Sequence, residues 1–244
     1  MSRLTDFKLL SFDVYGTLID WELGAYNAFK PTLEKSGKPD MDPRHIFEVL
    51  QSVQVPEQKR NPGQIYSKQL TKIHAPLCKE LDLQTPTEEE SKKFGDSVPD
   101  WPAFEDTVEA LKRLKKVYKM VVLSNVDNTS FAGCNSSSNG LQGFEWDLVL
   151  TAEDIGSYKP DHKNFEYMLK KVHEEFGIEK GQVLQTAQSQ FHDHHPAKEM
   201  GIKSSWIYRP NQIKGNRQDP VYNWKFDTLA EMADAVEKEL AEGR

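Results

Sequence analysis

Cysteine and long apolar runs are both scarce in this chain. Its two cysteines, Cys78 and Cys134, stand far apart and fit neither a metal knuckle nor a redox pair. No apolar run approaches the roughly 18 residues that a membrane span needs, and residues 1–10 lack the charged head and apolar stretch of a secretory signal. We therefore expect no disulfide scaffold, no membrane partner and a cytoplasmic location.

Basic residues are also in short supply. The sequence has 31 Lys and Arg residues against 38 Asp and Glu residues, for a net charge of −7. An acidic surface repels nucleic acid and anionic membranes, so nucleic acid is not an expected partner. With 37% apolar and 28% charged residues, the composition is typical of a soluble globular protein that buries a sizeable core.

Short apolar runs that alternate with helical patterns predict an α/β fold. Parallel strands that are covered on both faces read as continuous apolar runs. Amphipathic spacing from 108 to 115 and from 165 to 172 predicts helices between such runs, and the spacing from 227 to 240 predicts a C-terminal helix. This alternation indicates a doubly wound parallel sheet with helices on both faces. The predicted strands are Lys8–Phe12, Lys119–Leu123, Leu148–Thr151, Val183–Thr186 and Ser205–Tyr208.

A long polar segment after the first strand interrupts this alternation. It keeps a helical spacing and contains no good strand candidate. We interpret it as a helical cap domain at 21–99, inserted into a core domain formed by 1–20 and 100–244. Prolines in the segment are expected at helix starts and in loops, among them Pro43, Pro56 and Pro76.

The strongest chemical pattern directly follows the first predicted strand. The strand ends at Asp13, and Gly16 and Thr17 come shortly after it. A carboxylate at a strand end in a crevice can act as a covalent nucleophile. Glycine allows a tight turn whose backbone amides can point at a ligand.

Three later segments add polar groups to the same edge of the predicted sheet. Ser124 and Asn125 end the second strand, Lys159 lies in a loop before a helix, and Asp193 follows the fourth strand. Because the carboxyl ends of parallel strands share one edge, these groups should meet near Asp13. Carboxylates, small hydrogen-bond donors and one cation form a site that can handle a small anionic substrate.

These four motifs, in this order and spacing, resemble the haloacid dehalogenase (HAD) superfamily. The resemblance covers about residues 7–20 and 100–210, and the helical insertion lies where that superfamily places its cap. Residues 196–201 and 206–209 are further similar to the type II 2-haloacid dehalogenase-like subgroup. The fold that the resemblance implies is a HAD-like core with a cap after the first strand.

The resemblance also implies roles for single residues. Asp13 would be the nucleophile, and Thr17, Ser124 and the amides of the first loop would hold the nucleophile or the substrate anion. Asn125 would line the pocket, and Lys159 would balance the negative charge. The resemblance makes Asp193 the fourth-motif acid, which can bond to Lys159 or position water.

Position 15 separates the chemistries of the superfamily. Its phosphatases carry an acid two residues after the nucleophile, which protonates the leaving alkoxide, whereas this chain has Tyr15. The ordinary pKa of tyrosine is about 10, too high for an efficient general acid at neutral pH. A halide leaves without a proton, and the resemblance marks Tyr15 as a substrate-binding residue of dehalogenases.

The implied reaction is hydrolysis of a short 2-haloacid through an ester on Asp13. Asp13 displaces halide from C2, and water, with Asp193 as its first candidate base, releases the 2-hydroxyacid. No metal or other cofactor is required for this reaction, whereas a phosphatase would need Mg²⁺. Two alternatives stay open: a Mg²⁺-dependent phosphatase and a non-catalytic ligand-binding protein. A homodimer is a further expectation, because dimers are common among similar proteins.

Several positions depart from the resembled dehalogenases. Their cap supplies an arginine for the halide, where this chain aligns Gln51, with Arg44 and Arg60 as substitutes. A tyrosine after the lysine motif becomes Phe165, and a serine and an asparagine before the fourth-motif acid become glutamines, at Gln188 and Gln190. These changes bear on the substrate rather than on the fold.

Overall fold

The computed structural model describes residues 2–61, 64–216 and 218–243 of the chain. The strands are β1 (Leu9–Phe12), β2 (Lys119–Ser124), β3 (Leu148–Thr151), β4 (Val183–Ala187), β5 (Lys203–Ile207) and β6 (Trp224–Phe226). The helices are α1 (Trp21–Lys35), α2 (Pro43–Arg60), α3 (Tyr66–Glu80), α4 (Glu88–Asp96), α5 (Thr107–Lys115), α6 (Asn128–Ser136), α7 (Ala152–Ile155), α8 (His162–Phe176), α9 (His195–Glu199) and α10 (Leu229–Glu242).

The described strands form one six-stranded parallel sheet in the order β3-β2-β1-β4-β5-β6. β1 lies in the middle, with Leu9 opposite Lys119 of β2 on one side and Val183 of β4 on the other. The chain runs outward from β1 in both directions, so the strand order reverses between β1 and β4. Open α/β sheets bind ligands outside the carboxyl ends of strands at such a reversal.

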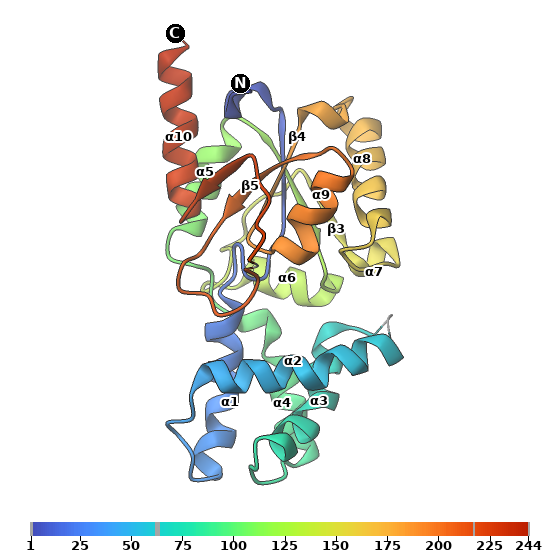
Figure 1. Ribbon diagram of the computed structural model, residues 1–244, viewed down its shortest axis with the longest axis vertical. Helices are drawn as coiled ribbons and strands as arrows, with labels where there is room; N and C mark the ends of the chain where they lie inside the picture. The colour runs from blue at the N-terminus through green and yellow to red at the C-terminus, as the bar shows by residue number, and fades with distance from the viewer. Residues whose placement is uncertain (1, 62–63, 217, 244) are drawn as a thin grey trace.

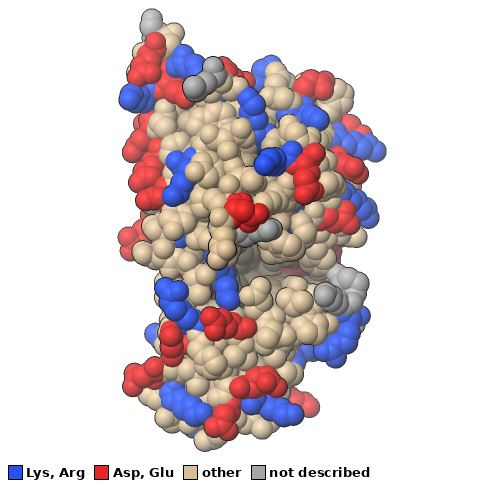
Figure 2. Space-filling view, viewed as in Figure 1, with Lys and Arg blue, Asp and Glu red and all other residues tan. Residues whose placement is uncertain are grey.

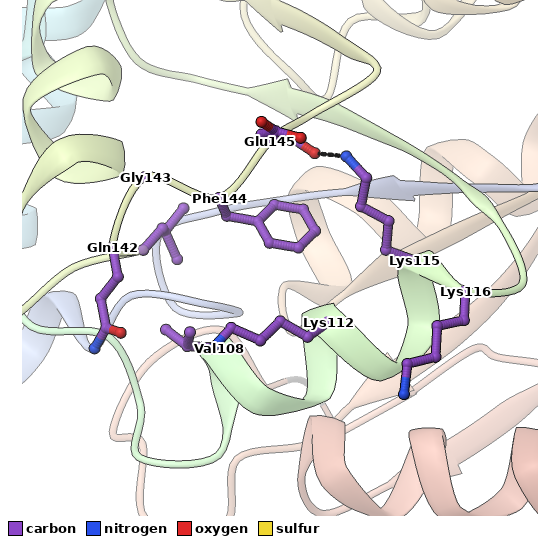
Figure 3. A pocket seen from close by; sticks show the side chains of 9 residues that line it. Val108, Lys112, Lys115, Lys116, Gln142, Gly143, Phe144 and Glu145 are labelled. Atoms are coloured by element: carbon purple, nitrogen blue, oxygen red, sulfur yellow. Dashed lines mark hydrogen bonds between the residues drawn. The ribbon is translucent and has the colours of Figure 1, made fainter.

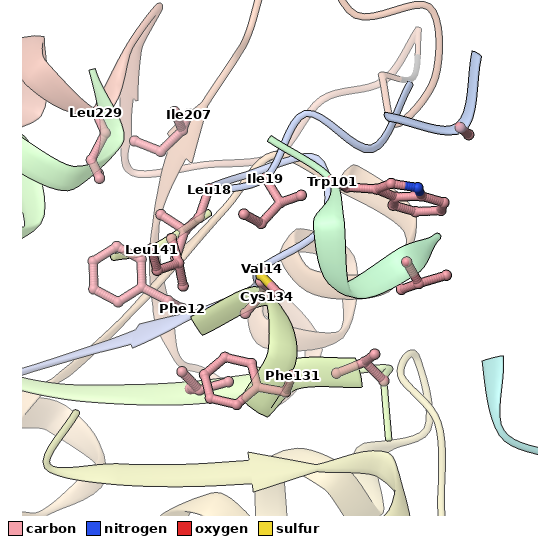
Figure 4. Close-up of a cluster of buried hydrophobic side chains, with 14 of the residues drawn as sticks. Phe12, Val14, Leu18, Ile19, Trp101, Phe131, Cys134, Leu141, Ile207 and Leu229 are labelled. Atoms are coloured by element: carbon pink, nitrogen blue, oxygen red, sulfur yellow. The ribbon is translucent and has the colours of Figure 1, made fainter. Parts of the chain in front are cut away.

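Alternation along the strands divides the core between the two faces of the sheet. Leu10 and Val122 belong to the larger apolar cluster, on the side of α5 and α10, whereas Leu9 and Val121 belong to a second cluster with Phe165 of α8. Successive strand residues point to opposite faces, so the apolar runs serve both clusters. Figure 4 shows part of the larger cluster around the first loop.

The cap is formed by α1 to α4 and lies against the carboxyl ends of the strands, opposite both chain termini (Figure 1). Its buried side chains, such as Phe29, Leu70 and Phe94, continue the larger apolar cluster of the core through Val98 and Trp101. The surface is hollowed between cap and core in Figure 2. The cap is thus placed to cover the reversal point of the sheet.

The predicted fold class is confirmed, and the predicted strands are close to the observed ones. β1 and β4 differ from the predicted ranges by one residue at one end, and β2 extends to Ser124. The last predicted strand is displaced, because β5 begins at Lys203 and ends at Ile207. The short edge strand β6 was not predicted, since its three residues are only partly buried or exposed and carry no apolar run.

Helix starts follow local capping chemistry. Thr228 caps α10, with its hydroxyl accepting a hydrogen bond from the Glu231 amide at 3.2 Å. Pro43 occupies the first turn of α2, as expected, but Pro56 and Pro76 lie inside helices. The prediction that these two prolines mark helix starts or loops is therefore wrong. None of the helices that the structure describes is long and apolar enough to cross a membrane.

Candidate active site

The residues predicted to carry chemistry meet at the reversal point of the sheet. Asp13 directly follows β1, and Asp193 lies in a π-helical turn, Gln190–His194, after β4. Lys159 comes from the loop between α7 and α8 and reaches between the two carboxylates. Side-chain exposure is 11% for Asp13, 1% for Lys159 and 0% for Asp193, so the charges interact almost out of contact with water.

Asp13 is held by one hydroxyl and one ammonium. Its Oδ2 accepts a hydrogen bond from Thr17 Oγ1 at 2.8 Å, and its Oδ1 accepts one from Lys159 Nζ at 2.9 Å. Thr17 Oγ1 also accepts a bond from the Gln188 amide at 2.9 Å, which fixes the direction of its own proton. These hydrogen bonds therefore fix the orientation of the Asp13 carboxylate.

The loop after Asp13 closes on itself around Val14. The amides of Leu18 and Ile19 donate to the Val14 carbonyl at 2.8 and 2.9 Å, and Gly16, at φ +96°, supplies a backbone conformation that favours glycine. Within the described structure the N–H groups of Val14 and Tyr15 donate to no carbonyl. These two amides next to Asp13 are free to bind an anion.

Lys159 uses all three of its ammonium protons. Nζ donates to Asp13 Oδ1 at 2.9 Å, to Asp193 Oδ1 at 2.7 Å and to the Leu123 carbonyl at 2.7 Å. Burial lowers the pKa of Lys159, but the two carboxylates outweigh it and the pKa lies above its ordinary value. The lysine is thus a fixed cation and cannot serve as a base.

Asn125 and Ser124, at the end of β2, differ in their hydrogen-bond partners. The Asn125 amide is paired with the Lys159 backbone: Nδ2 donates to the Lys159 carbonyl at 2.9 Å, and Oδ1 accepts from the Lys159 N–H at 2.7 Å. Asn125 therefore positions Lys159, and its predicted contact with substrate stays a prediction. Ser124 is buried and its hydroxyl makes no hydrogen bond to a described residue, so it remains available for a ligand.

Asp193 is the most deeply buried acid of the site. Its Oδ1 accepts bonds from Lys159 at 2.7 Å and from Gln185 Nε2 at 2.9 Å, whereas its buried Oδ2 has no partner among the described residues. Burial raises the pKa of Asp193 to about 7, against the opposing effect of Lys159. A carboxyl with a pKa near neutrality is suited to proton transfer.

Aromatic side chains surround the first loop. The Tyr15 ring packs edge-on against Trp101 at 5.9 Å, and Trp101 contacts Tyr66 of the cap at 6.2 Å. Trp21 packs against Phe47 of the cap at 5.3 Å. Burial raises the pKa of Tyr15 well above its ordinary value, so this hydroxyl stays protonated and does not act as the acid that a phosphatase requires.

Two buried charged residues hold the loops over the strand ends. Arg209 donates from Nε and Nη2 to the Thr17 carbonyl at 3.1 and 2.8 Å and from Nη1 to Asp106 at 2.5 Å. Glu22 accepts from the amides of Ile213 and Lys214 at 2.8 and 2.7 Å. Both contacts tie the first loop and the start of α1 to the segment after β5.

The positions that depart from the resembled dehalogenases differ in burial and in their contacts. Gln51 and Arg44 are exposed on α2, and exposed Arg60 lies 3.7 Å from Glu57. No hydrogen bond or ion pair joins these three described residues to the Asp13 cluster. Phe165 is fully buried in the second apolar cluster. Gln188, besides its amide contact with Thr17, donates from Nε2 to the Lys214 carbonyl at 2.8 Å.

The histidines around Asp193 each have their own hydrogen-bond partner. His192 Nδ1 lies 3.1 Å from Ser189 Oγ, and His195 Nε2 lies 3.1 Å from the Asp219 carbonyl. His194 is buried, with Nε2 donating to the Ala187 carbonyl at 2.8 Å and Nδ1 accepting from Ser204 at 2.9 Å. Burial lowers the pKa of His194 to about 4, so its ring is neutral. The three rings serve local structure.

A cavity of about 370 Å³ lies elsewhere, between α5 and the segment 141–145. Lys112, Lys115 and Lys116 border it, and Phe144 and Val108 contribute apolar surface (Figure 3). Lys115 is already engaged with the Glu145 carbonyl. None of the residues lining this cavity belongs to the Asp13 cluster.

Gln185 is the site residue that the sequence reasoning missed. It was treated only as part of a predicted strand, yet its side chain contacts Asp193. A signal was present, because a glutamine follows two apolar residues, Val183 and Leu184, in a strand predicted to be buried. Polar groups buried there need a partner, and here the partner lies in the π-helical turn that follows the strand.

Comparison with known proteins identifies a family for this sequence. The family described as "Haloacid dehalogenase-like hydrolase" matches residues 10–207, well over half of the chain. The chain therefore belongs to that family. No curated protein matches the sequence.

Solved structures share the fold at low sequence identity. The L-2-haloacid dehalogenase PA0810 is 20% identical, with a TM-score of 0.77 over 95% of this chain and 99% of that one. The L-2-haloacid dehalogenase from Xanthobacter autotrophicus with chloropropionic acid covalently bound is 16% identical, with a TM-score of 0.73 over 95% and 98%. The magnesium-bound protein YfnB from Bacillus subtilis is 16% identical, with a TM-score of 0.73 over 96% and 98%.

Proposed function

Because the chain is a haloacid dehalogenase-like hydrolase, we propose that it hydrolyses a short-chain 2-haloacid to a 2-hydroxyacid through an ester on Asp13. The observation that carries this proposal is the Asp13–Lys159–Asp193 cluster beside Tyr15, whose pKa is raised by burial and which is therefore a poor general acid for a leaving alkoxide. The solved relative with covalently bound chloropropionic acid supports the same reaction class.

In the first step one carboxylate oxygen of Asp13 attacks C2 of the substrate. A carbon–oxygen bond forms, the carbon–halogen bond breaks, and the bonding electrons leave with the halide. Inversion at C2 follows from attack opposite the leaving group. The unpaired N–H groups of Val14 and Tyr15 and the hydroxyl of Ser124 are the groups that bind the substrate carboxylate.

In the second step water attacks the ester carbonyl carbon of Asp13. One water proton passes to Asp193 Oδ2 as the water oxygen bonds to carbon. Collapse of the tetrahedral intermediate expels the product alkoxide, which takes that proton back, and the regenerated Asp13 carboxyl releases the other proton to solvent. Lys159 stabilises the negative charge that develops at the ester oxygen.

The proposed reaction needs no metal ion or organic cofactor. The positive charge at the reacting carboxylate comes from Lys159, whose ammonium lies within 2.9 Å of both acids. A phosphoryl substrate would bring about two negative charges to this place, and Lys159 alone would leave them under-compensated. A departing halide, by contrast, carries only a single negative charge.

The deciding experiment measures halide release from each enantiomer of 2-chloropropionate in the presence of a chelator. Wild-type protein and Asp13→Asn are compared, with circular dichroism as the check on folding. Release from one enantiomer by the wild type alone is the expected result. No release by the wild type, together with Mg²⁺-dependent turnover of phosphate esters, would replace the proposal by a phosphatase. Inactivity in both assays would favour a ligand-binding role.

A further inference from the structure

Gln185 makes a contact that distinguishes the two oxygens of Asp193. Gln185 lies on β4 between Leu184 and Thr186 and is fully buried. Its Nε2 donates to Asp193 Oδ1 at 2.9 Å, the same oxygen that Lys159 Nζ contacts at 2.7 Å. Asp193 Oδ2 is equally buried and has no partner among the described residues.

The two donors make the oxygens of Asp193 chemically unequal. An oxygen that already accepts two hydrogen bonds has little remaining basicity, whereas an unpaired buried oxygen keeps all of its own. We propose that Gln185 is a positioning residue for ester hydrolysis: with Lys159 it occupies Oδ1 of Asp193 and leaves Oδ2 as the oxygen that takes the proton of the attacking water.

This inference rests on the proposed function for its kinetic part. The proton moves from water to Asp193 Oδ2 while the water oxygen bonds to the ester carbon, as described above. Rotation of the carboxyl would exchange Oδ1 and Oδ2, and only the fixed amide and ammonium oppose it. Lys159 reaches Oδ1 from the loop before α8 and Gln185 reaches it from β4, so the two donors together restrain the carboxyl.

The placement of Gln185 is not explained by packing. Its Oε1 is buried without a partner among the described residues, so the side chain carries an unpaired polar atom in the sheet. Burying an unpaired polar atom is unfavourable. Another favourable contact of the same side chain must therefore offset this cost. The contact with Asp193 is the one polar contact that its side chain makes to the described residues.

Asp13, His192 and His194 are the other titratable groups around Asp193. Asp13 faces it across Lys159 and contributes negative charge. His194, next in the chain, is neutral and bonded to Ala187 and Ser204. His192 bonds to Ser189, the residue that caps the same turn. Gln185 is therefore the neutral donor whose removal changes Asp193 without changing the net charge of the site.

The test compares Gln185→Met with Thr186→Val. Methionine keeps the length and volume of glutamine and removes the donor. The control removes a neighbouring buried hydroxyl that has no partner and lies on the opposite face of β4. In Gln185→Met we expect the midpoint of Asp193 ionisation to rise by about one pH unit, since a hydrogen bond to the charged form is lost. Thr186→Val should leave it unchanged.

The first readout needs no substrate. Carbon-13 NMR of labelled aspartate follows the ionisation of Asp193, assigned with Asp193→Asn, in both variants. In the wild type, the side-chain amide protons of Gln185 should titrate with the same midpoint, which tests the contact even if Gln185→Met does not fold. An unshifted midpoint in folded Gln185→Met, or amide protons that do not follow Asp193, would overturn the inference.

The second readout separates the two chemical steps. At pH 6, Gln185→Met should release halide in a burst equal to the enzyme concentration, then hydrolyse the Asp13 ester about tenfold more slowly than the wild type. Mass spectrometry would detect the accumulated ester. Equal slowing of both steps would indicate a merely structural role and overturn the inference. A wild type without any turnover, but with the expected NMR shift, would instead reject the proposed function.

Discussion

Replacing Lys159 by methionine removes the cation between the two acids of the site. The ammonium lies 2.9 Å from Asp13 and 2.7 Å from Asp193, and the lysine is 2% exposed, so water cannot take its place. Removing one partner of a buried ion pair costs about 3–5 kcal/mol, because the other charge is left uncompensated. We expect Lys159→Met to lower the free energy of unfolding by this amount at pH 8.

The loss of stability in Lys159→Met should be larger at high pH than at low pH. Burial already raises the pKa of Asp193 to about 7, and removal of the ammonium raises it further. The folded variant then binds a proton that the unfolded chain has lost above about pH 4. Stability of the variant therefore falls as pH rises, and the deficit relative to wild type should shrink at pH 5, where Asp193 is protonated.

Urea unfolding at pH 5 and pH 8, followed by circular dichroism, measures this difference. Lys163→Met is the matched control, since Lys163 is exposed at the start of α8 and should contribute within about 0.5 kcal/mol. The reasoning is refuted if the deficit of Lys159→Met at pH 8 is below about 1 kcal/mol, the value for an exposed pair. An equal deficit at both pH values would refute it as well.

Three further predictions follow from single contacts. Thr17→Val removes the hydroxyl that donates to Asp13 and accepts from the Gln188 amide, and should cost about 1–3 kcal/mol in urea unfolding together with most of the turnover; unchanged turnover would contradict the orienting role. Arg209→Lys loses the fork on the Thr17 carbonyl and should destabilise the protein by about 1–3 kcal/mol, seen as a lower Tm. Burial lowers the pKa of His74 in the cap to about 4, so the contribution of neutral His74 to stability is lost as pH falls from 6.5 toward 4. His74→Leu should flatten that part of the stability–pH curve. An unaltered slope would contradict this prediction.

Sequence patterns located the elements that depend on local chemistry. Apolar runs marked β1, β2 and β4 because a central parallel strand is buried on both faces. A shorter apolar run also marked edge strand β3, of which the second half is buried. Amphipathic spacing marked α5, α8 and α10. Edge strand β6 carries no such run, so its three residues could not be recognised. The interior position of Pro56 and Pro76 also escaped prediction, because proline is disfavoured inside helices, yet both prolines are exposed on helices that bury other side chains, such as Phe47 and Leu77.

The acids and the lysine of the site were visible in the sequence, but the arrangement of their partners was not. A polar residue directly after a predicted parallel strand indicates a functional group at one edge of the sheet. Which atoms meet depends on how three loops pack together. Asn125 shows the difference: its position was predicted, yet its amide is bonded to the backbone of Lys159.

The sequence by itself determined the fold class, the inserted cap and the nucleophile candidate, because hydrophobic periodicity is local and the order and spacing of the motifs can be read along the chain. Only the tertiary structure decided the strand order, the burial of Lys159 between Asp13 and Asp193, and the contact of Gln185 with one oxygen of Asp193. Burial and hydrogen-bond partners across the chain set the pKa values on which the chemistry depends, and neither can be read from local pattern.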